Sequence, residues 1–303
     1  MKKSYKHISL AKICGWFGIT RQAYYQYGWR MMDYTNEAEL LIKEILKIRK
    51  NHKRMGGRKL YDKLTDFMLE HQIKMGRDIF FDLLSANNLL VKKRKRKIHT
   101  TNSFHWLRKY PNLIKGYKLT GPNQLWVSDI TYWKIEDRYL YISLITDAYS
   151  HMIVGYQLAE TLKAIESIKA LKMAIKNLVK PAKKLIHHSD RGVQYCSADY
   201  VKILNDNKIK ISMTENGDPL ENPVAERING ILKDEYLLDE QVHCIKQARR
   251  VLAKSVDLYN TDRPHMSISN MTPSKVHLGL NTETPKRLWK NYYNPKRKQA
   301  LQV

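Results

Sequence analysis

The sequence predicts an α/β fold, in which a mixed sheet carries helices on its faces and helical segments precede it. From about residue 122, segments rich in Val, Ile, Tyr and Trp are separated by short polar breaks and then alternate with helical patterns, in the order βββαβαβα. Residues 37–90 instead show three amphipathic helical patterns. This succession is typical of a five-stranded mixed sheet behind a helical front part.

The first 30 residues contain a helix–turn–helix-like pattern. In residues 8–27, ISLAKICGWFGITRQAYYQY, Leu10, Cys14 and Phe17 follow helical spacing. Gly18 marks a turn, and Thr20 is placed to cap a second helix. We expect a small helical segment over 1–30 that is too short to fold alone.

Residues 37–92 form the second predicted segment. Three helices are expected in EAELLIKEILKIRKNH, RKLYDKLTDFMLEH and GRDIFFDLLSANNLL, and the pair Gly56-Gly57 ends the first of them. Three short helices of this kind suit a helix–turn–helix or winged-helix unit. The alternative is a plain packed helical domain.

A run of six positive charges follows, at Lys92, Lys93, Arg94, Lys95, Arg96 and Lys97. Such a run repels itself and does not fold alone. We therefore expect a basic linker over 93–117. It acts either as a solvated connection or as an arm that follows a phosphate backbone.

The sheet domain is expected over 118–240. QLWVSDITYWKI, RYLYISLITDAYS and HMIVGYQLAE predict a meander of three strands, and KKLIHHSD and IKISMTE predict two further short strands. The intervening helices are ESIKALKMAIKNLV and SADYVKILNDNK, and NPVAERINGILKDEYL follows the last strand. A C-terminal helix at roughly 246–259 leads into a basic tail, which completes a segment over 241–303.

Charge indicates the kind of partner. The 303 residues carry a net charge of +25, and residues 1–120 hold 27 basic against 9 acidic residues. A charge this positive requires a polyanion, either nucleic acid or an anionic membrane. No apolar run approaches the roughly 20 residues that span a bilayer, so we expect no membrane and favour nucleic acid. The three cysteines lack CxxC spacing, which favours a reducing, cytoplasmic location.

Three carboxylates are candidates for chemistry. Asp129 lies in the first predicted strand, and Asp190 ends the fourth, immediately before Arg191. Glu226 lies near the start of the helix after the fifth strand and shares its face with Lys233 at i+7. Each acidic residue alone is more often a surface group or a helix cap. The hypothesis of a site therefore depends on the three acting together.

Phosphodiester chemistry explains why such carboxylates would be gathered. Attack by water or a 3′-hydroxyl requires a deprotonated nucleophile, neutralised phosphoryl oxygens and a stabilised leaving oxygen. Two divalent ions about 3.5–4 Å apart supply all three. Mg²⁺ prefers carboxylate oxygen and water as ligands. Without metal the carboxylates repel one another, so we expect strict metal dependence.

These motifs together resemble a known family. WVSDITY around Asp129, HSDRGVQY around Asp190 and NPVAERINGILKDEY around Glu226 are similar to the transposases of the IS-three family of bacterial insertion sequences, in their second reading-frame product. Thirty-five residues separate Asp190 from Glu226, the spacing of the Asp-Asp-Glu class. YNTDRPHMSISNMTPSKV, which begins at Tyr259, and the helical unit with Gly56-Gly57 extend the resemblance over nearly the whole chain.

The resemblance implies an RNase H-like, integrase-type catalytic core that cleaves insertion-sequence ends and transfers DNA strands. Asp129, Asp190 and Glu226 would be catalytic and would bind two Mg²⁺ ions, with Mn²⁺ as a substitute. Lys233 would contact DNA near the transposon end, and we expect further contacts from Arg191, Arg227, Arg263 and the basic run. Joining two ends implies a homo-oligomer on terminal-repeat and target DNA.

The chain departs from the family pattern in two ways. The loop before Glu226 reads NGDPLENPVAE, with Pro219 and Pro223 where the family more often has a GN-x-x-DNA-x-x-E run. In addition, no heptad run is visible, so the first reading-frame product would act as a separate partner or as a fusion.

Two histidines and two tryptophans are expected to be structural, and two other functions fit parts of the sequence. His187 and His188 point to opposite sides of one strand, so we expect satisfied core or edge histidines rather than a metal pair. Trp126 and Trp133 are expected in the core. Two rival functions are a non-catalytic, sequence-specific DNA-binding protein from a remnant element and a nuclease of the ribonuclease H type.

Overall fold

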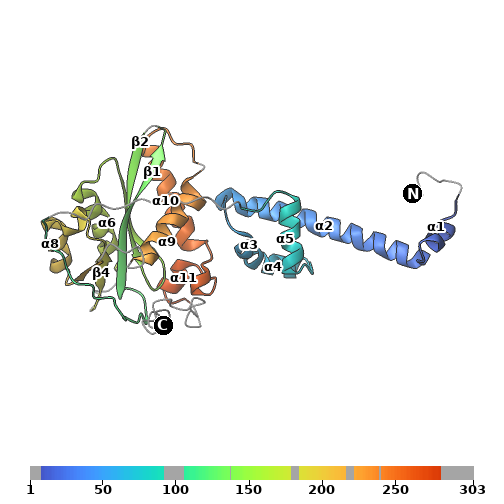
Figure 1. Ribbon diagram of the computed structural model, residues 1–303, viewed down its shortest axis with the longest axis horizontal. Helices are drawn as coiled ribbons and strands as arrows, with labels where there is room; N and C mark the ends of the chain where they lie inside the picture. Colours follow the sequence, from blue (N-terminus) through green and yellow to red (C-terminus); the bar gives the residue numbers. More distant parts are fainter. Residues whose placement is uncertain are drawn as a thin grey trace, which may run out of the picture. The chain divides into compact units, whose positions relative to one another are not determined.

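The computed structural model describes residues 8–91, 106–136, 138–178, 184–215, 222–238 and 240–280, without the side chains at 30, 31 and 33. The chain divides into two compact units, residues 1–91 and 92–303. Each unit is described by itself (Figure 1). The basic run at 92–97, the loop at 216–221 and the tail from 281 lie outside the described residues.

The first unit is helical throughout its described part. It contains α1 (Leu10–Trp16), α2 (Arg21–Asn51), α3 (Gly57–Lys63), α4 (Thr65–Glu70) and α5 (Arg77–Ala86). Thr20 caps α2 as predicted, since its hydroxyl accepts the N–H of Ala23 at 3.0 Å. No strand occurs within residues 8–91, so the described part of this unit has no wing.

The observed length of α2 shows that the predicted boundary between the segments 1–30 and 37–92 is wrong. It continues without interruption from Arg21 to Asn51 and so crosses residues 30–37. The core of the unit begins only at Ala38, and is formed with residues such as Leu41, Ile45, Leu60 and Phe80. A Cβ atom on Gly57 would lie 2.9 Å from the ring of Phe81, so a larger residue where α3 meets α5 would have to displace that ring.

The second unit is built on the predicted five-stranded mixed sheet. Its strands are β1 (Leu125–Ile135), β2 (Arg138–Asp147), β3 (Ile153–Ala159), β4 (Ile186–Ser189) and β5 (Lys210–Met213). The strand order is β3-β2-β1-β4-β5. Strands β1, β2 and β3 are antiparallel, whereas β4 runs parallel to both β1 and β5.

Helices cover both faces of this sheet (Figure 1). On one face lie α6 (Ala164–Lys176), α7 (Val193–Cys196) and α8 (Ala198–Asp206), which pack on Trp126 and Ile145. On the other lie α9 (Pro223–Ile231), a π-helical turn (Leu232–Leu237) and α10 (Ile245–Thr261), which pack on Trp133 and Leu140. A 3-10 turn (Met266–Ile268) and α11 (Pro273–His277) follow. Both tryptophans are therefore core residues, as predicted.

A glycine brings β3 close to α6. A Cβ atom on Gly155 would lie 2.3 Å from the carbonyl oxygen of Ala170, a distance that no side chain tolerates. The backbone of the strand and the helix can therefore meet only at a glycine.

Two predicted boundaries in this unit also change. The second half of the expected linker lies on the core, because the N–H of Leu113 donates to the hydroxyl of Ser212 at 2.9 Å and Tyr110 packs beside the α8 side of the sheet. Helix α10 contributes Leu252 and Tyr259 to the same core as the strands. Residues 107–117 and α10 are thus parts of the sheet unit.

No helix within the described ranges is both long enough and apolar enough to cross a bilayer.

Candidate active site

Strand pairing brings two of the predicted carboxylates to the same level. In the parallel pair β1 and β4, Val127 lies opposite His188. Continuing this register by two residues places Asp129 level with Asp190, the first residue after β4. Neighbouring strands lie roughly 4.8 Å apart, and equivalent positions project to the same face. The two carboxylates therefore share one face of the sheet.

Backbone N–H groups orient both of these carboxylates. The N–H of Ile130 donates to Oδ1 of Asp129 at 2.8 Å, and the N–H of Gly192 donates to Oδ1 of Asp190 at 3.0 Å. A Cβ atom on Gly192 would come within 3.0 Å of that same Asp190 oxygen. The glycine after Arg191 thus leaves room for the carboxylate.

Two asparagines of the α9 segment attach it to β1 beside this pair. The side-chain amide of Asn222 donates to the carbonyl oxygen of Ser128 at 2.9 Å, and the amide of Asn229 donates to Oδ2 of Asp129 at 2.6 Å. Asn222, Glu226 and Asn229 are spaced i, i+4 and i+7, so they share one face of the helix. Glu226 itself is exposed on this helix, near enough to Asp129 for its charge to act on that carboxylate.

The amide pair, Asn222 and Asn229, was missed by the sequence analysis. Asn222 stands at the N-cap position of α9, but its side chain makes no cap hydrogen bond and reaches Ser128 instead. The i, i+4, i+7 spacing around Glu226 was a usable signal for both residues. What the sequence could not show is that their partners are consecutive residues of β1.

Electrostatics couple all three carboxylates through Asp129. Burial, and next the charge of Asp190, raises the pKa of Asp129 to about 7, with a smaller contribution from Glu226. The hydrogen bonds from Asn229 and Ile130 act in the opposite direction. A raised pKa from burial and like charges means that ionised Asp129 is destabilised in the absence of a cation.

The donor set suits a hard divalent cation. Carboxylate oxygens are the ligands that Mg²⁺ prefers, and the mutual repulsion at Asp129 is what a cation would relieve. Within the described ranges, however, no group of three His, Cys, Asp or Glu side chains is arranged to hold one ion in common. The structure thus brings Asp129 and Asp190 together and Glu226 to their side, without closing a three-ligand cage.

Lys233 lies against Tyr132 of β1. Its ammonium group is 4.2 Å from the centre of the Tyr132 ring, a cation–π contact. Burial lowers the pKa of Lys233, while the charges of Asp234 and Asp129 oppose that shift. The π-helical turn that carries Lys233 continues directly from α9. Such turns are frequent at functional sites.

The structure does not support the predicted DNA contact of Arg263. Its side chain is 1% exposed, and its Nε and Nη2 atoms donate to the two carboxylate oxygens of Glu235 at 2.8 and 2.7 Å. A buried guanidinium engaged in this way is not available to a phosphate. Arg263 instead joins the end of α10 to the π-helical turn.

The other predicted DNA contacts have different surroundings. Arg227 is exposed on α9, and Arg191 is partly exposed beside Asp190. The six residues from Lys92 to Lys97 lie outside the described residues.

The two histidines are core residues, as predicted. Nε2 of His187 lies 2.7 Å from the hydroxyl of Ser128 and 2.9 Å from that of Tyr200, and burial lowers its pKa to about 3. Nδ1 of His188 lies 2.9 Å from the hydroxyl of Ser212. These contacts support the sheet beneath the carboxylates.

The raised pKa of Asp129 predicts how stability depends on pH. Between about pH 4 and 7 the folded chain keeps a proton that the unfolded chain, with a pKa near 3.8, has lost. The metal-free protein therefore becomes less stable as pH rises through this window, by at most about 4 kcal/mol. Denaturant unfolding at pH 5 and pH 8 should show this loss in the wild type and a much smaller one in Asp129→Asn. Equal losses in both proteins would contradict the assignment.

The hydrogen bond from Asn229 predicts a positioning role. We expect Asn229→Ala to lower metal-dependent DNA cleavage by about 10- to 100-fold, the usual effect of removing a group that orients a ligand. It should also move the pH window of Asp129 upward, because that hydrogen bond lowers the pKa of Asp129. Asn207→Ala, on the exposed end of α8, is the control. A cleavage defect with an unchanged pH window would indicate a merely structural role.

A mixed five-stranded sheet with two acidic residues level on neighbouring strands, and a third on the helix attached beside them, defines an RNase H-like, integrase-type core. Two models described as integrase core domain match residues 120–219 and 207–273. The insertion element IS600 uncharacterized 31 kDa protein of Shigella sonnei is 33% identical over 266 residues, covering 86% of this chain and 96% of that protein. The chain belongs to the IS-three family of insertion-sequence transposases.

Other proteins and one solved structure are also similar to parts of this chain. The transposase for insertion sequence element IS629 of Shigella sonnei is 27% identical over 78% of both chains. Transposase InsF for insertion sequence IS3A of Escherichia coli is 28% identical over 63% of this chain and 67% of its own. The HTLV-2 integrase catalytic core domain, solved in complex with magnesium, has a TM-score of 0.42 and 23% identity over 52% of this chain and 97% of its own.

Proposed function

We propose that this protein catalyses metal-dependent cleavage of insertion-sequence ends and their transfer to target DNA. The observation that carries the proposal is the coupling of Asp190 and Glu226 to Asp129, whose pKa they both raise. Family membership supports a polynucleotidyl transferase. The reaction is in-line displacement at phosphorus, first by water and then by the freed 3′-hydroxyl, without a covalent protein–DNA intermediate.

The chain's own residues prepare the site for this reaction. Asp129, Asp190 and Glu226 would hold two Mg²⁺ ions, or Mn²⁺, which supply activation of the nucleophile and stabilisation of the leaving oxygen. Asn229 fixes the carboxylate of Asp129 through Oδ2. Lys233 provides a positive charge beside Asp129 that is suited to a phosphate of the transposon end.

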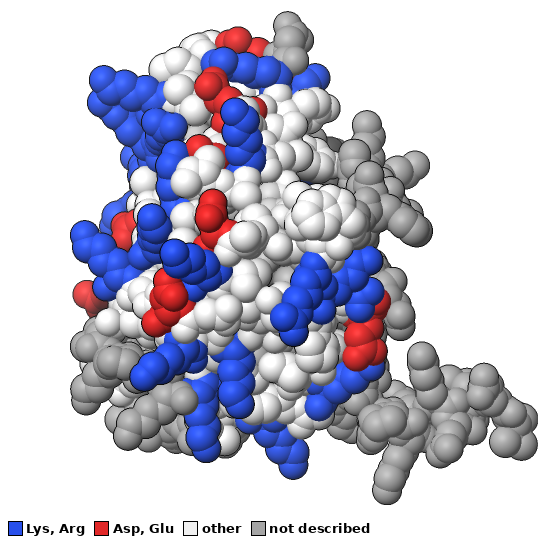
Figure 2. Space-filling view, turned by 90° about the vertical axis from the view of Figure 1, so that its left-hand side faces the viewer, with Lys and Arg blue, Asp and Glu red and all other residues white. Residues whose placement is uncertain are grey.

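The exposed cations provide a surface for the DNA backbone. Figure 2 shows Lys and Arg side chains spread over the face of the second unit that carries α6 and α8. Exposed lysines on these helices and on the turns beside them include Lys169, Lys172, Lys176, Lys202 and Lys208. Arg191 and Arg227 would contact DNA at the carboxylates, whereas the lysines of α6 and α8, across the sheet from α9, would bind a further part of the terminal-repeat or target DNA. Affinity should fall steeply as salt rises.

One assay tests the proposal against its rivals. Short DNA carrying the terminal repeat is incubated with the full chain, with and without Mg²⁺, and both binding and nicking are measured. The proposal requires nicking at the repeat end in Mg²⁺ or Mn²⁺ and none in chelator. A gel shift without nicking would support the non-catalytic DNA-binding protein, and preferential cutting of an RNA–DNA hybrid would support the ribonuclease. Addition of the first reading-frame product tests whether the chain acts alone or with that partner.

A further inference from the structure

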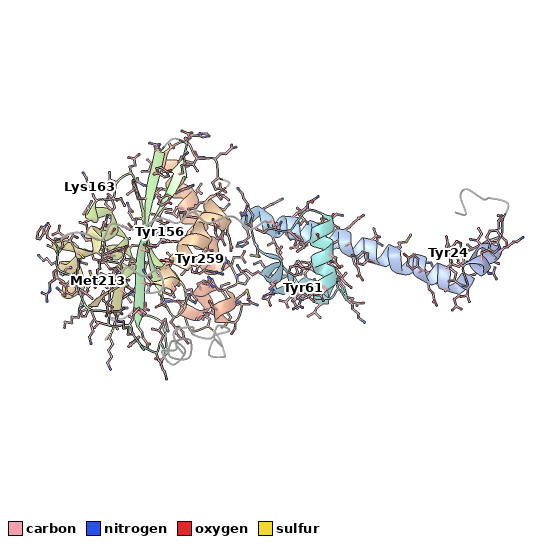
Figure 3. The ribbon with its side chains drawn as sticks, in the orientation of Figure 1. Tyr24, Tyr61, Tyr156, Lys163, Met213 and Tyr259 are labelled. Atoms are coloured by element: carbon pink, nitrogen blue, oxygen red, sulfur yellow. The ribbon has the colours of Figure 1, made fainter. Side chains whose placement is uncertain are left out.

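The first unit carries a concentrated apolar surface that its own core does not cover. Nine of its large hydrophobic side chains between residues 16 and 34 are exposed, among them Trp16, Phe17, Tyr25, Tyr27, Trp29 and Met32. We name α1 and residues 17–36 the hairpin surface. Figure 1 shows no other helix of this unit beside it, and in Figure 3 Tyr24 projects from the beginning of α2 next to α1.

Little inside the unit stabilises this segment. Among the described side chains of residues 8–36, only Leu10 and Cys14 are buried. The core begins at Ala38, so α2 extends beyond it by nearly five turns. Helical segments of this length are marginal in water unless an apolar face is packed. A packing partner outside the unit would supply that contact.

Charge identifies the chemistry of the partner. Residues 8–36 contain only four charged residues, Lys12, Arg21, Arg30 and Asp33, in a chain that is 27% charged. A phosphate backbone or an anionic membrane would be met by many cations. Depletion of charge together with Tyr, Trp and Met is instead typical of the centre of a protein–protein interface.

Area and symmetry favour a second copy of the chain. An aromatic side chain buries about 150–250 Å² when fully covered, and the nine side chains are each about half exposed. Covering them would therefore remove roughly 900 Å² per copy, close to the ~800 Å² per partner of a stable interface. A twofold pairing covers both hairpin surfaces with one contact, since each copy presents the same apolar residues.

A glycine within the surface supports close helix pairing. Gly28 lies inside α2, where glycine weakens a helix, and a Cβ atom there would meet no atom of the chain within 4 Å. Nothing within the described part of the chain therefore requires a glycine. A partner helix that approaches the backbone closely at this position would require a glycine there.

We propose that the hairpin surface pairs with the hairpin surface of a second copy and so makes the protein a dimer in the absence of DNA. The proposal does not depend on the proposed function, because self-association is measured without DNA or metal.

The test is analytical ultracentrifugation of the full chain over about a hundredfold range of concentration, at salt high enough to screen charge. The wild type should show a reversible monomer–dimer equilibrium. Trp29→Glu combined with Met32→Glu should weaken it by at least about 100-fold, since central aromatic residues dominate such interfaces. Gly28→Leu should weaken it too while strengthening the isolated helix, which separates lost pairing from lost folding. Leu69→Glu, equally exposed in the same unit, should change nothing.

Three results would overturn the proposal. One is a wild type that stays monomeric throughout. Another is a dimer that survives all the hairpin-surface variants, because another surface would then hold it. The third is unchanged self-association with lost binding to DNA or to anionic vesicles, which would make the surface a contact for those partners. Circular dichroism confirms that each variant is folded.

Discussion

Replacing Asp190 by Asn is expected to lower metal-dependent cleavage of transposon-end DNA by about 1,000-fold or more, while DNA binding stays within about twofold. The substitution preserves the shape of the side chain and leaves an oxygen to accept the N–H of Gly192, now 3.0 Å from Oδ1. It removes only the negative charge. Losing several kcal/mol of charge stabilisation at the transferring phosphate corresponds to a rate loss of this size.

The same substitution has a second expected effect that does not involve cleavage. Since the charge of Asp190 raises the pKa of Asp129, its removal should bring that pKa down and move the pH-dependent loss of stability to lower pH. Asp199→Asn, an exposed carboxylate in the first turn of α8, is the matched control and should behave as wild type. Cleavage by Asp190→Asn at the normal rate would show that Asp190 takes no part in the reaction.

The sequence contained enough information to predict the sheet and to select the three carboxylates of the candidate site. The strands are visible as local patterns in the sequence. Strands β1 and β2 are rich in Val, Ile, Tyr and Trp, and β4 and β5 are short apolar runs, so they can be recognised without knowing the fold. Because β1 and β4 are parallel neighbours, Asp129 and Asp190 follow from strand positions once the sheet order is known. Glu226 could be assigned to its face because helical periodicity is equally local.

Features that depend on tertiary partners could not be predicted in the same way. The polar run DYTNE at 33–37 looks like a break, but no proline or glycine ends α2 there, and the helix continues to the core residues from Ala38 onward. The amide of Asn229 and the carboxylate of Asp129 are 100 residues apart in the chain, so nothing local connects them. Arg263 was predicted to contact DNA because it is a cation in a basic chain. Its partner Glu235 is 28 residues earlier, so no local pattern indicates that the two side chains pair.

Removal of Arg263 is accordingly expected to destabilise the fold rather than to weaken DNA binding. Arg263→Ala would leave Glu235, which is itself mostly buried, without its bidentate partner. Breaking a buried ion pair from one side costs about 3–5 kcal/mol. Arg263→Lys should recover little of this, since a lysine ammonium cannot reproduce the two parallel hydrogen bonds.

The measurement is denaturant unfolding combined with DNA affinity across a salt series. Arg263→Ala should lose the stated stability, whereas its salt dependence of DNA binding should match wild type in the folded protein. The exposed pair of Arg138 and Glu160 is the control, and Arg138→Ala should change stability by less than about 1 kcal/mol. Glu235→Leu combined with Arg263→Met should regain much of the loss, because apolar replacement removes both buried charges. If Arg263→Ala instead unfolded normally and its DNA affinity depended less steeply on salt, Arg263 would be a DNA contact.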